Sequence, residues 1–158
     1  MRFVVAAALA LAAVPEPAAA CQQLPMAFFD FGSAALRGHE IARLRYFADQ
    51  MRVQSGEIEL IEVVGHSDRT GSPAARERIA RRRAEAVRDL LVSLGLPAGI
   101  VSASGAADRR PLAETDDHVR EPQNRRVELA VTFTPQARAA AAARREEAIA
   151  RGEGVPMC

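Results

Sequence analysis

Apolar residues in the middle of the chain recur with the period of a helix in two stretches, residues 38–54 and 72–95. In both stretches an apolar residue returns every three or four positions, which is typical of a helix with one buried face. Ser72 followed by Pro73 is a favourable helix start, and Gly95 is a favourable helix end. The pattern therefore predicts two amphipathic helices.

Shorter apolar runs before, between and after these helices predict four strands. These are residues 27–31, 58–64, 100–103 and 127–133. The second run is apolar on both faces and should be central, whereas in the last run apolar and polar residues alternate, so that one face should be solvated. Two helices covering one side of a small mixed sheet make an α+β two-layer sandwich. The turn-rich residues 108–123 should cross the surface near the loop after the second strand.

The two ends of the chain have a different composition. Arg2, the apolar run 4–14 and the small residues 18–20 form the pattern of an export signal, and the run is too short to span a membrane as a helix. We therefore expect three parts: a signal peptide at 1–20, one domain at 21–134, and an Ala- and Arg-rich helix with a tail at 135–158.

The two cysteines, Cys21 and Cys158, leave two alternatives open. Cys21 follows three alanines that resemble a lipobox, although Ala18 stands where Leu is usual, so Cys21 could carry the lipid of a lipoprotein. The other alternative is a disulfide between Cys21 and Cys158 in an oxidising compartment. Both alternatives predict a protein outside the cytoplasm.

The overall composition excludes one class of partner. The chain has 21 basic and 20 acidic residues, one Tyr and no Trp. Nucleic-acid-binding domains instead concentrate positive charge on one face, so we expect no nucleic acid as a partner.

One charged residue interrupts the apolar face of the second helix. Arg83 lies at helical spacing between Ile79 and Val87, where a guanidinium must find a partner because arginine keeps its charge when it is buried. Asp68, in the loop before the helix, is the nearest plausible partner. The pair predicts either a structural ion pair or a site for a ligand that carries both charges.

His66 offers a further alternative, because it lies two residues before Asp68. One histidine and one carboxylate supply half of a zinc site, and no further ligand stands nearby in the sequence. A nucleophile with a base and an orienting partner cannot be recognised either. We therefore expect no metal, no cofactor and no enzymatic activity.

Four segments of the chain resemble the signature blocks of the OmpA-like C-terminal peptidoglycan-binding domain, in the order and at the spacing of that family. They are Phe29-Asp30-Phe31-Gly32-Ser33-Ala34, Gly65-His66-Ser67-Asp68-Arg69-Thr70-Gly71-Ser72, Arg82-Arg83-Ala84-Glu85-Ala86-Val87 and Asn124-Arg125-Arg126-Val127-Glu128. The resemblance covers residues 27–134 and implies a β-α-β-α-β sandwich. It also implies a ligand, the peptide stem of peptidoglycan, bound through its diaminopimelate residue.

The resemblance assigns roles to particular residues. Asp68 and Arg83 would grip the zwitterionic end of diaminopimelate, with Ser67 beside them in place of the usual Thr. Arg76 and Ala75 stand where the family has Asn and Tyr, so Arg76 is expected to offer a cation to a stem carboxylate. The other arginines from 76 to 82 are expected on a solvated helix face.

Asn124 and Arg125 would frame the site or pin the loops around it. The function implied is non-covalent binding of the cell wall, which a lipid on Cys21 would tether to the outer membrane. The alternative is a structural periplasmic subunit of an envelope complex, in which an Asp68–Arg83 ion pair is architectural.

Overall fold

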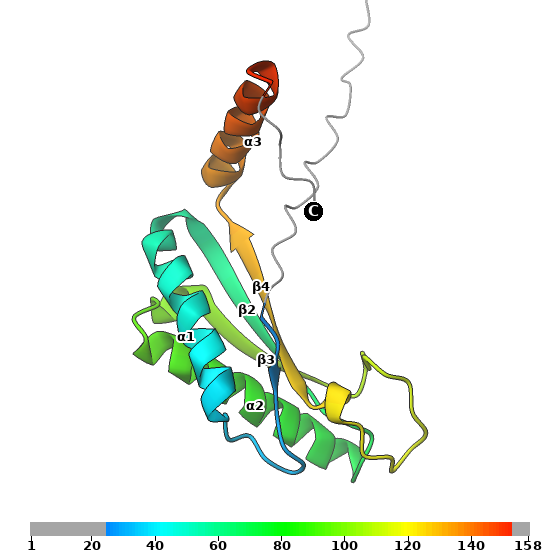
Figure 1. The fold of residues 1–158 in the computed structure, drawn as a ribbon. Helices are drawn as coiled ribbons and strands as arrows, with labels where there is room; N and C mark the ends of the chain where they lie inside the picture. Colours follow the sequence, from blue (N-terminus) through cyan, green and yellow to red (C-terminus); the bar gives the residue numbers. More distant parts are fainter. Residues whose placement is uncertain (1–24, 153–158) are drawn as a thin grey trace, which may run out of the picture.

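The computed structural model describes residues 25–152 (Figure 1). The expected signal peptide, Cys21 and Cys158 lie outside the described residues. Lipidation of Cys21 and a disulfide between the two cysteines therefore stay predictions.

A mixed four-stranded sheet forms one layer of the domain. Its strands are β1 (Ala27–Phe28), β2 (Ile58–His66), β3 (Val101–Ala107) and β4 (Arg126–Phe133), in the spatial order β1-β4-β2-β3. Strand β2 pairs in parallel with β3 and antiparallel with β4, which also pairs antiparallel with β1. The expected central place of the second strand is confirmed.

Two helices form the second layer, on one face of this sheet (Figure 1). Helix α1 spans Gly38–Val53 and helix α2 spans Pro73–Ser93. The Ser72 hydroxyl accepts the N–H of Ala75 at 3.3 Å, and Gly95 has a positive φ of 97° beyond the end of α2. The predicted start and end signals of α2 are thus both used, and the expected α+β two-layer sandwich is confirmed.

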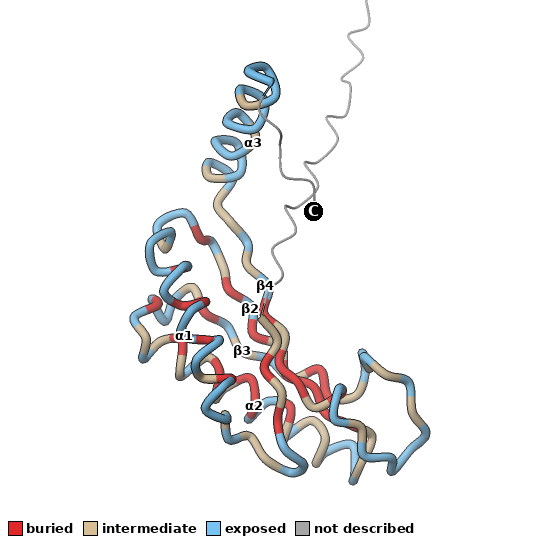
Figure 2. The backbone as a smooth tube through the Cα atoms, in the orientation of Figure 1, coloured by how far each residue is buried: buried red, intermediate tan, exposed pale blue. Residues whose placement is uncertain are grey.

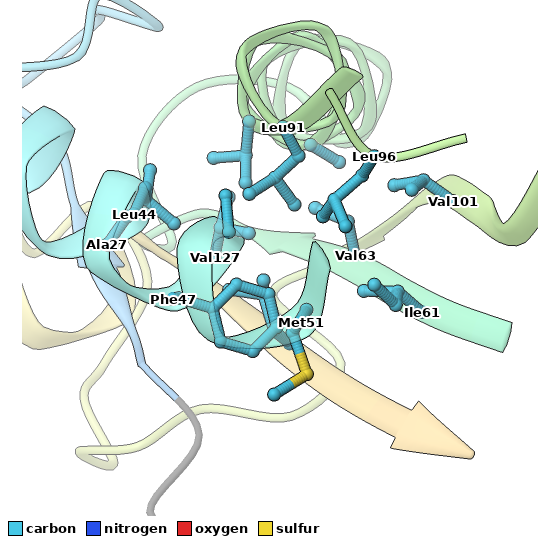
Figure 3. Close-up of a cluster of buried hydrophobic side chains, with 14 of the residues drawn as sticks. Ala27, Leu44, Phe47, Met51, Ile61, Val63, Leu91, Leu96, Val101 and Val127 are labelled. Carbon is cyan, nitrogen blue, oxygen red and sulfur yellow. The ribbon is translucent and has the colours of Figure 1, made fainter. Parts of the chain in front are cut away.

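The hydrophobic core lies between the helices and the sheet. Figure 2 shows buried backbone along β2, the start of β4 and the inner side of both helices. In Figure 3 the side chains of Leu44, Phe47 and Met51 from α1 lie near Val127 of β4 and near Ile61 and Val63 of β2. Gly65 allows close packing of β2 on α2, because a Cβ there would clash with the carbonyl of Ala80.

Two strands differ in length from the prediction. The first ends at Phe28 instead of residue 31, because the chain turns at Gly32, which has a positive φ of 65°, and directs the carbonyls of Asp30 and Ser33 toward Arg83. The third extends to Ala107 instead of residue 103. Its Gly105 lies against α2, where a Cβ would stand 3.1 Å from the backbone nitrogen of Arg81.

Two short 3-10 helices, at Ser55–Glu57 and Ala98–Ile100, lead into β2 and β3, and a third, at Pro122–Asn124, precedes β4. Helix α3 (Pro135–Ala150) follows β4 and is capped by Thr134. None of its residues is buried, and it projects away from the sheet (Figures 1 and 2). Among residues 25–152, every helix is too short or too polar to cross a membrane.

Candidate ligand-binding site at the start of α2

A pocket of about 330 Å³ opens where the loop after β2 leads into α2. It is lined by the turn after β1, by this loop and by one face of the helix. The lining residues are Phe31, Gly32, Ser67, Asp68, Thr70, Gly71, Ala75, Arg78, Ile79, Arg82 and Arg83. A larger hollow of about 1070 Å³ lies between α1 and the β1–β4 edge, but none of the site residues expected from the sequence lines it.

The loop after β2 holds Asp68 in a buried position at the pocket. The N–H of Ser67 donates to the carbonyl of Ala107 at 2.9 Å and so keeps the start of the loop beside β3. Asp68 is only 4% exposed. Its carboxylate accepts the Thr70 hydroxyl at 2.7 Å, and its second oxygen lies 3.2 Å from the guanidinium of Arg125. A carboxylate this buried is stabilised because both oxygens have partners.

Arg83 enters the pocket from α2 and is 1% exposed. Its guanidinium donates to three backbone carbonyls: Nε to Ser33 at 2.9 Å, Nη1 to His66 at 2.9 Å and Nη2 to Asp30 at 3.2 Å. Burial lowers the pKa of Arg83 to about 10, against the opposing effect of the Asp68 charge. A guanidinium has five N–H groups, so the remaining ones have no acceptor among the described residues.

The expected direct ion pair between Asp68 and Arg83 is therefore wrong. Asp68 pairs with Arg125 at the start of β4, and the donors of Arg83 are directed to carbonyls of the β1 turn and of the end of β2. The two charges still act on each other, since Asp68 raises the pKa of Arg83. The side chains of Asp68 and Arg83 line the same pocket, and each has hydrogen-bond partners other than the other.

Ser67 is 2% exposed, and its hydroxyl has no hydrogen-bond partner in the described part of the chain. Ser67 is also one of the residues that line the pocket. Arg125 also donates to the carbonyl of Phe29 at 3.1 Å, which fixes the guanidinium that faces Asp68.

The other expected site residues lie outside the pocket. Asn124 is buried, and its side chain binds the backbone of Leu112 and Ala113 through three hydrogen bonds. Asn124 thus pins the turn-rich segment. Arg76 binds Asp108 at 2.8 Å and does not line the pocket.

The turn-rich residues 108–123 run beside the loop after β2, as expected from the sequence (Figure 1). Arg69 holds the two together, because its carbonyl accepts the N–H of His118 and its guanidinium donates to the carbonyl of Thr115. Arg120, in the same segment, lies 4.0 Å from the centre of the Phe31 ring.

Sequence reasoning missed Arg78 and Arg82, which line the pocket although both are exposed. Each stands one position before an inward-facing residue of α2, Ile79 and Arg83. On a helical projection at about 100° per residue, Arg82 lies about 100° and Arg78 about 140° from Arg83, outside the apolar stripe, so the stripe does not mark either one. Thr70 and Phe31 were also missed, and no periodic pattern marks either one.

His66 belongs to a separate cluster. It is fully buried, and its Nε2 lies 3.4 Å from the carboxylate of Glu128. The same carboxylate accepts a hydrogen bond from Nε of Arg126 at 2.8 Å. Burial lowers the pKa of His66 to about 4, and the charge of Arg126 acts in the same direction. Among residues 25–152, no three His, Cys, Asp or Glu side chains come close enough to hold a metal ion.

The fold and the charged pocket at the start of α2 are accompanied by a clear similarity to known proteins. Residues 28–125 match the OmpA family, and the chain belongs to this family. It is 35% identical over 104 residues to outer membrane porin F of Pseudomonas aeruginosa. The match covers 65% of this chain and 29% of that protein. It is 33% identical over 92 residues to the sodium-type flagellar protein MotY of Vibrio parahaemolyticus, covering 58% and 31%.

Two solved structures share the fold at higher coverage. The peptidoglycan-associated lipoprotein from Burkholderia pseudomallei superposes with a TM-score of 0.62 at 27% identity, over 68% of this chain and 89% of that one. The cell wall anchor of the type VI secretion system from Pseudomonas aeruginosa superposes with a TM-score of 0.54 at 28% identity, over 68% and 75%. The chain spans only about a third of the length of the curated relatives that it matches.

Proposed function

We propose that this chain binds peptidoglycan non-covalently, through the free end of diaminopimelate in the stem peptide. The single observation that carries the proposal is the pocket at the start of α2. There a buried carboxylate, a guanidinium with unused N–H groups and an unpartnered hydroxyl converge, on Asp68, Arg83 and Ser67. Membership in the OmpA family supports it, as does the similarity to the peptidoglycan-associated lipoprotein from Burkholderia pseudomallei.

The chemistry of the ligand matches this set of groups. The free end of diaminopimelate carries an ammonium and a carboxylate on one carbon, so its site needs an anion and a directed cation a few ångströms apart. Asp68 would accept the ammonium. The unused N–H groups of Arg83 and the N-terminus of α2 would bind the carboxylate. Ser67 would complete the contacts with its free hydroxyl.

The proposed cellular role combines binding of the cell wall by the domain with attachment to the outer membrane through Cys21. An exported chain with a lipid on Cys21 would hold the cell wall to the outer membrane, without chemical change to either. Relatives named as an outer membrane porin and as a cell wall anchor support this role. The lipid on Cys21 is a separate part of the proposal, and the intact mass of the mature protein tests it, because a diacylglycerol and a disulfide give different masses.

A structural role in an envelope complex is the second candidate. Two observations favour it: Arg83 ties three backbone segments together, and α3 has no buried residue among its sixteen. In this candidate the charges of the pocket stabilise the fold, and α3 is free to contact a partner protein.

Co-sedimentation with purified sacculi separates the two candidates. The wild-type chain should sediment with sacculi, and Asp68→Asn should weaken binding about ten- to a hundredfold, because a hydrogen bond between charged groups is lost. Asp89→Asn is the matched control, since Asp89 is an exposed aspartate on α2 far from the pocket. A folded wild-type chain that stays in the supernatant would contradict peptidoglycan binding.

A further inference from the structure

The pocket contains more positive than negative charge. Asp68 is its only acidic lining residue, and the charge of Asp68 is already matched by Arg125. Arg78, Arg82 and Arg83 add three positive charges to the lining. A zwitterionic ligand end is neutral overall, so it cannot by itself balance this excess.

Arg78 and Arg82 have no acidic partner within the described residues, whereas some arginines around them do. Arg88 pairs with Asp89 on the same helix, and Arg109 reaches across to Glu77 from the segment after β3. Arg78 and Arg82 are instead exposed, and they stand four positions apart on one face of α2, at the edge of the pocket. Two guanidinium groups in this position can bind one carboxylate together.

Small side chains leave room for a ligand to reach these two arginines. Ala75 and Gly71 line the same part of the pocket as Arg78. On the side of the β1 turn, Arg120 lies over the ring of Phe31 and brings a further positive charge close to the lining. The excess charge therefore lies at the outer part of the pocket, beyond the buried groups of Asp68 and Arg83.

We infer that Arg78 and Arg82 form a rim that binds a second carboxylate of the ligand. The inference rests on the proposed function. The rim makes the chain selective: a stem peptide whose carboxyl groups are free binds more tightly than one in which the carboxyl outside the zwitterionic end is amidated. The buried groups thus recognise the zwitterion, and the rim distinguishes the charge state of the rest of the peptide.

Calorimetric titration with two synthetic tripeptides tests this selectivity. Both contain alanine, γ-linked glutamate and diaminopimelate whose carboxyl outside the zwitterionic end is blocked as an amide; in one the glutamate α-carboxyl is free, and in the other it is amidated. The wild-type chain should bind the peptide with the free carboxyl about two- to fivefold more tightly, the range expected for partly exposed ion pairs. The double variant Arg78→Gln/Arg82→Gln should bind both peptides equally, with the affinity of wild type for the peptide with the amidated glutamate.

Arg81→Gln is the matched control, because Arg81 is an exposed arginine of the same helix that does not line the pocket. It should keep the wild-type preference. Equal wild-type affinity for the two peptides, or a preference that survives in the double variant, would overturn the rim while leaving the proposed function intact. A folded wild-type chain that binds neither peptide would overturn both.

Discussion

Two clusters of buried charge lie side by side at the end of β2, and only one of them lines the pocket at the start of α2. The pocket cluster consists of Asp68, Arg83 and Arg125, and the closed cluster of His66, Arg126 and Glu128. Arg125 and Arg126 are consecutive but belong to different clusters, because successive side chains of an extended chain point to opposite sides. The closed cluster contains buried polar atoms without a hydrogen-bond partner in the described residues, on His66 and Arg126, and Ser67 beside the pocket cluster has an unpartnered hydroxyl.

The difference teaches that buried charge alone does not identify a binding site. In the closed cluster, burial lowers the pKa of His66 to about 4, so this imidazole is neutral at neutral pH. For Glu128, burial alone would raise the pKa, but the hydrogen bonds and charge of Arg126 lower it below its usual range. Glu128 binds Arg126 and lies beside His66, and these contacts stabilise the fold. The pocket cluster has the same kinds of group, but two of its members, Asp68 and Arg83, line the pocket at the start of α2.

The largest effect is expected at Arg83, where the pocket cluster is also part of the fold. Arg83→Ala should lower the free energy of unfolding by about 3–5 kcal/mol, because three backbone carbonyls lose a charged donor. Arg83→Lys should restore only part of this free energy, since a compact ammonium cannot reach all three carbonyls that the planar guanidinium binds. Urea unfolding measures the free energy of unfolding of both variants. A loss below about 1 kcal/mol in Arg83→Ala would mean that Arg83 serves the ligand alone.

The second prediction concerns the closed cluster and its dependence on pH. The pKa of His66 lies below its ordinary value in the folded state, so the unfolded chain binds the proton more readily. Stability should therefore be complete above the unfolded pKa of about 6.5 and should fall as the pH falls toward about 4, with a loss of roughly 2 kcal/mol between about pH 7 and pH 5. Glu128 acts in the same direction at lower pH.

Urea unfolding at a series of pH values measures this loss, and His66→Gln should remove most of it while leaving sacculus binding unchanged. Arg126→Gln should raise the pKa of His66, because the charge of Arg126 is one of the causes that lower it, and NMR titration of the imidazole reads this directly. An imidazole that titrates near its ordinary pKa in the wild-type chain would show that the closed cluster is open to water. A binding loss on adding a strong chelator would restore the metal hypothesis.

The sequence predicts the helices of this fold better than its strands. Ser72, Pro73 and Gly95 act on neighbouring backbone groups, so the ends of α2 agree with the prediction within a residue or two. The end of β1 depends instead on two carbonyls that turn toward Arg83, which lies 50 and 53 positions away from them. The full length of β3 depends on how Gly105 fits against α2, and the residues next to it do not determine that contact.

Three of the six expected site residues, Ser67, Asp68 and Arg83, line one pocket, but the partners of these residues could not be predicted. The apolar stripe indicates Arg83, the loop sequence indicates Asp68, and only the family resemblance indicates Ser67. The partner of Asp68 is Arg125, which is 57 positions away and reaches the loop only because β4 lies next to β2. The donors of Arg83 bind main-chain carbonyls, and every residue type supplies a carbonyl. No pattern of side chains could mark those acceptors.

The smallest effect, and the most direct test of the two clusters, is a thermal shift with diaminopimelate. A ligand that binds only the folded chain stabilises it by mass action, so at ten times its dissociation constant the gain is about 1.4 kcal/mol. Asp68→Asn should lose this shift and still fold, because the amide oxygen can accept from Arg125 while the amide NH2 donates to the hydroxyl of Thr70. We expect it to cost the unliganded chain about 1–2 kcal/mol, less than Arg83→Ala, since Arg125 keeps its bond to Phe29.

The closed cluster supplies the control for this shift. His66→Gln changes a buried polar group near the same strand end, but it should keep the full thermal shift with diaminopimelate, because its side chain contacts Glu128 and not the pocket. Equal shifts in Asp68→Asn and His66→Gln would mean that diaminopimelate binds elsewhere. A wild-type chain that does not shift at millimolar diaminopimelate or stem peptide, together with an Asp68→Asn variant that melts far lower, would assign Asp68 to the fold. The pocket cluster would then stabilise the fold, as the closed cluster does.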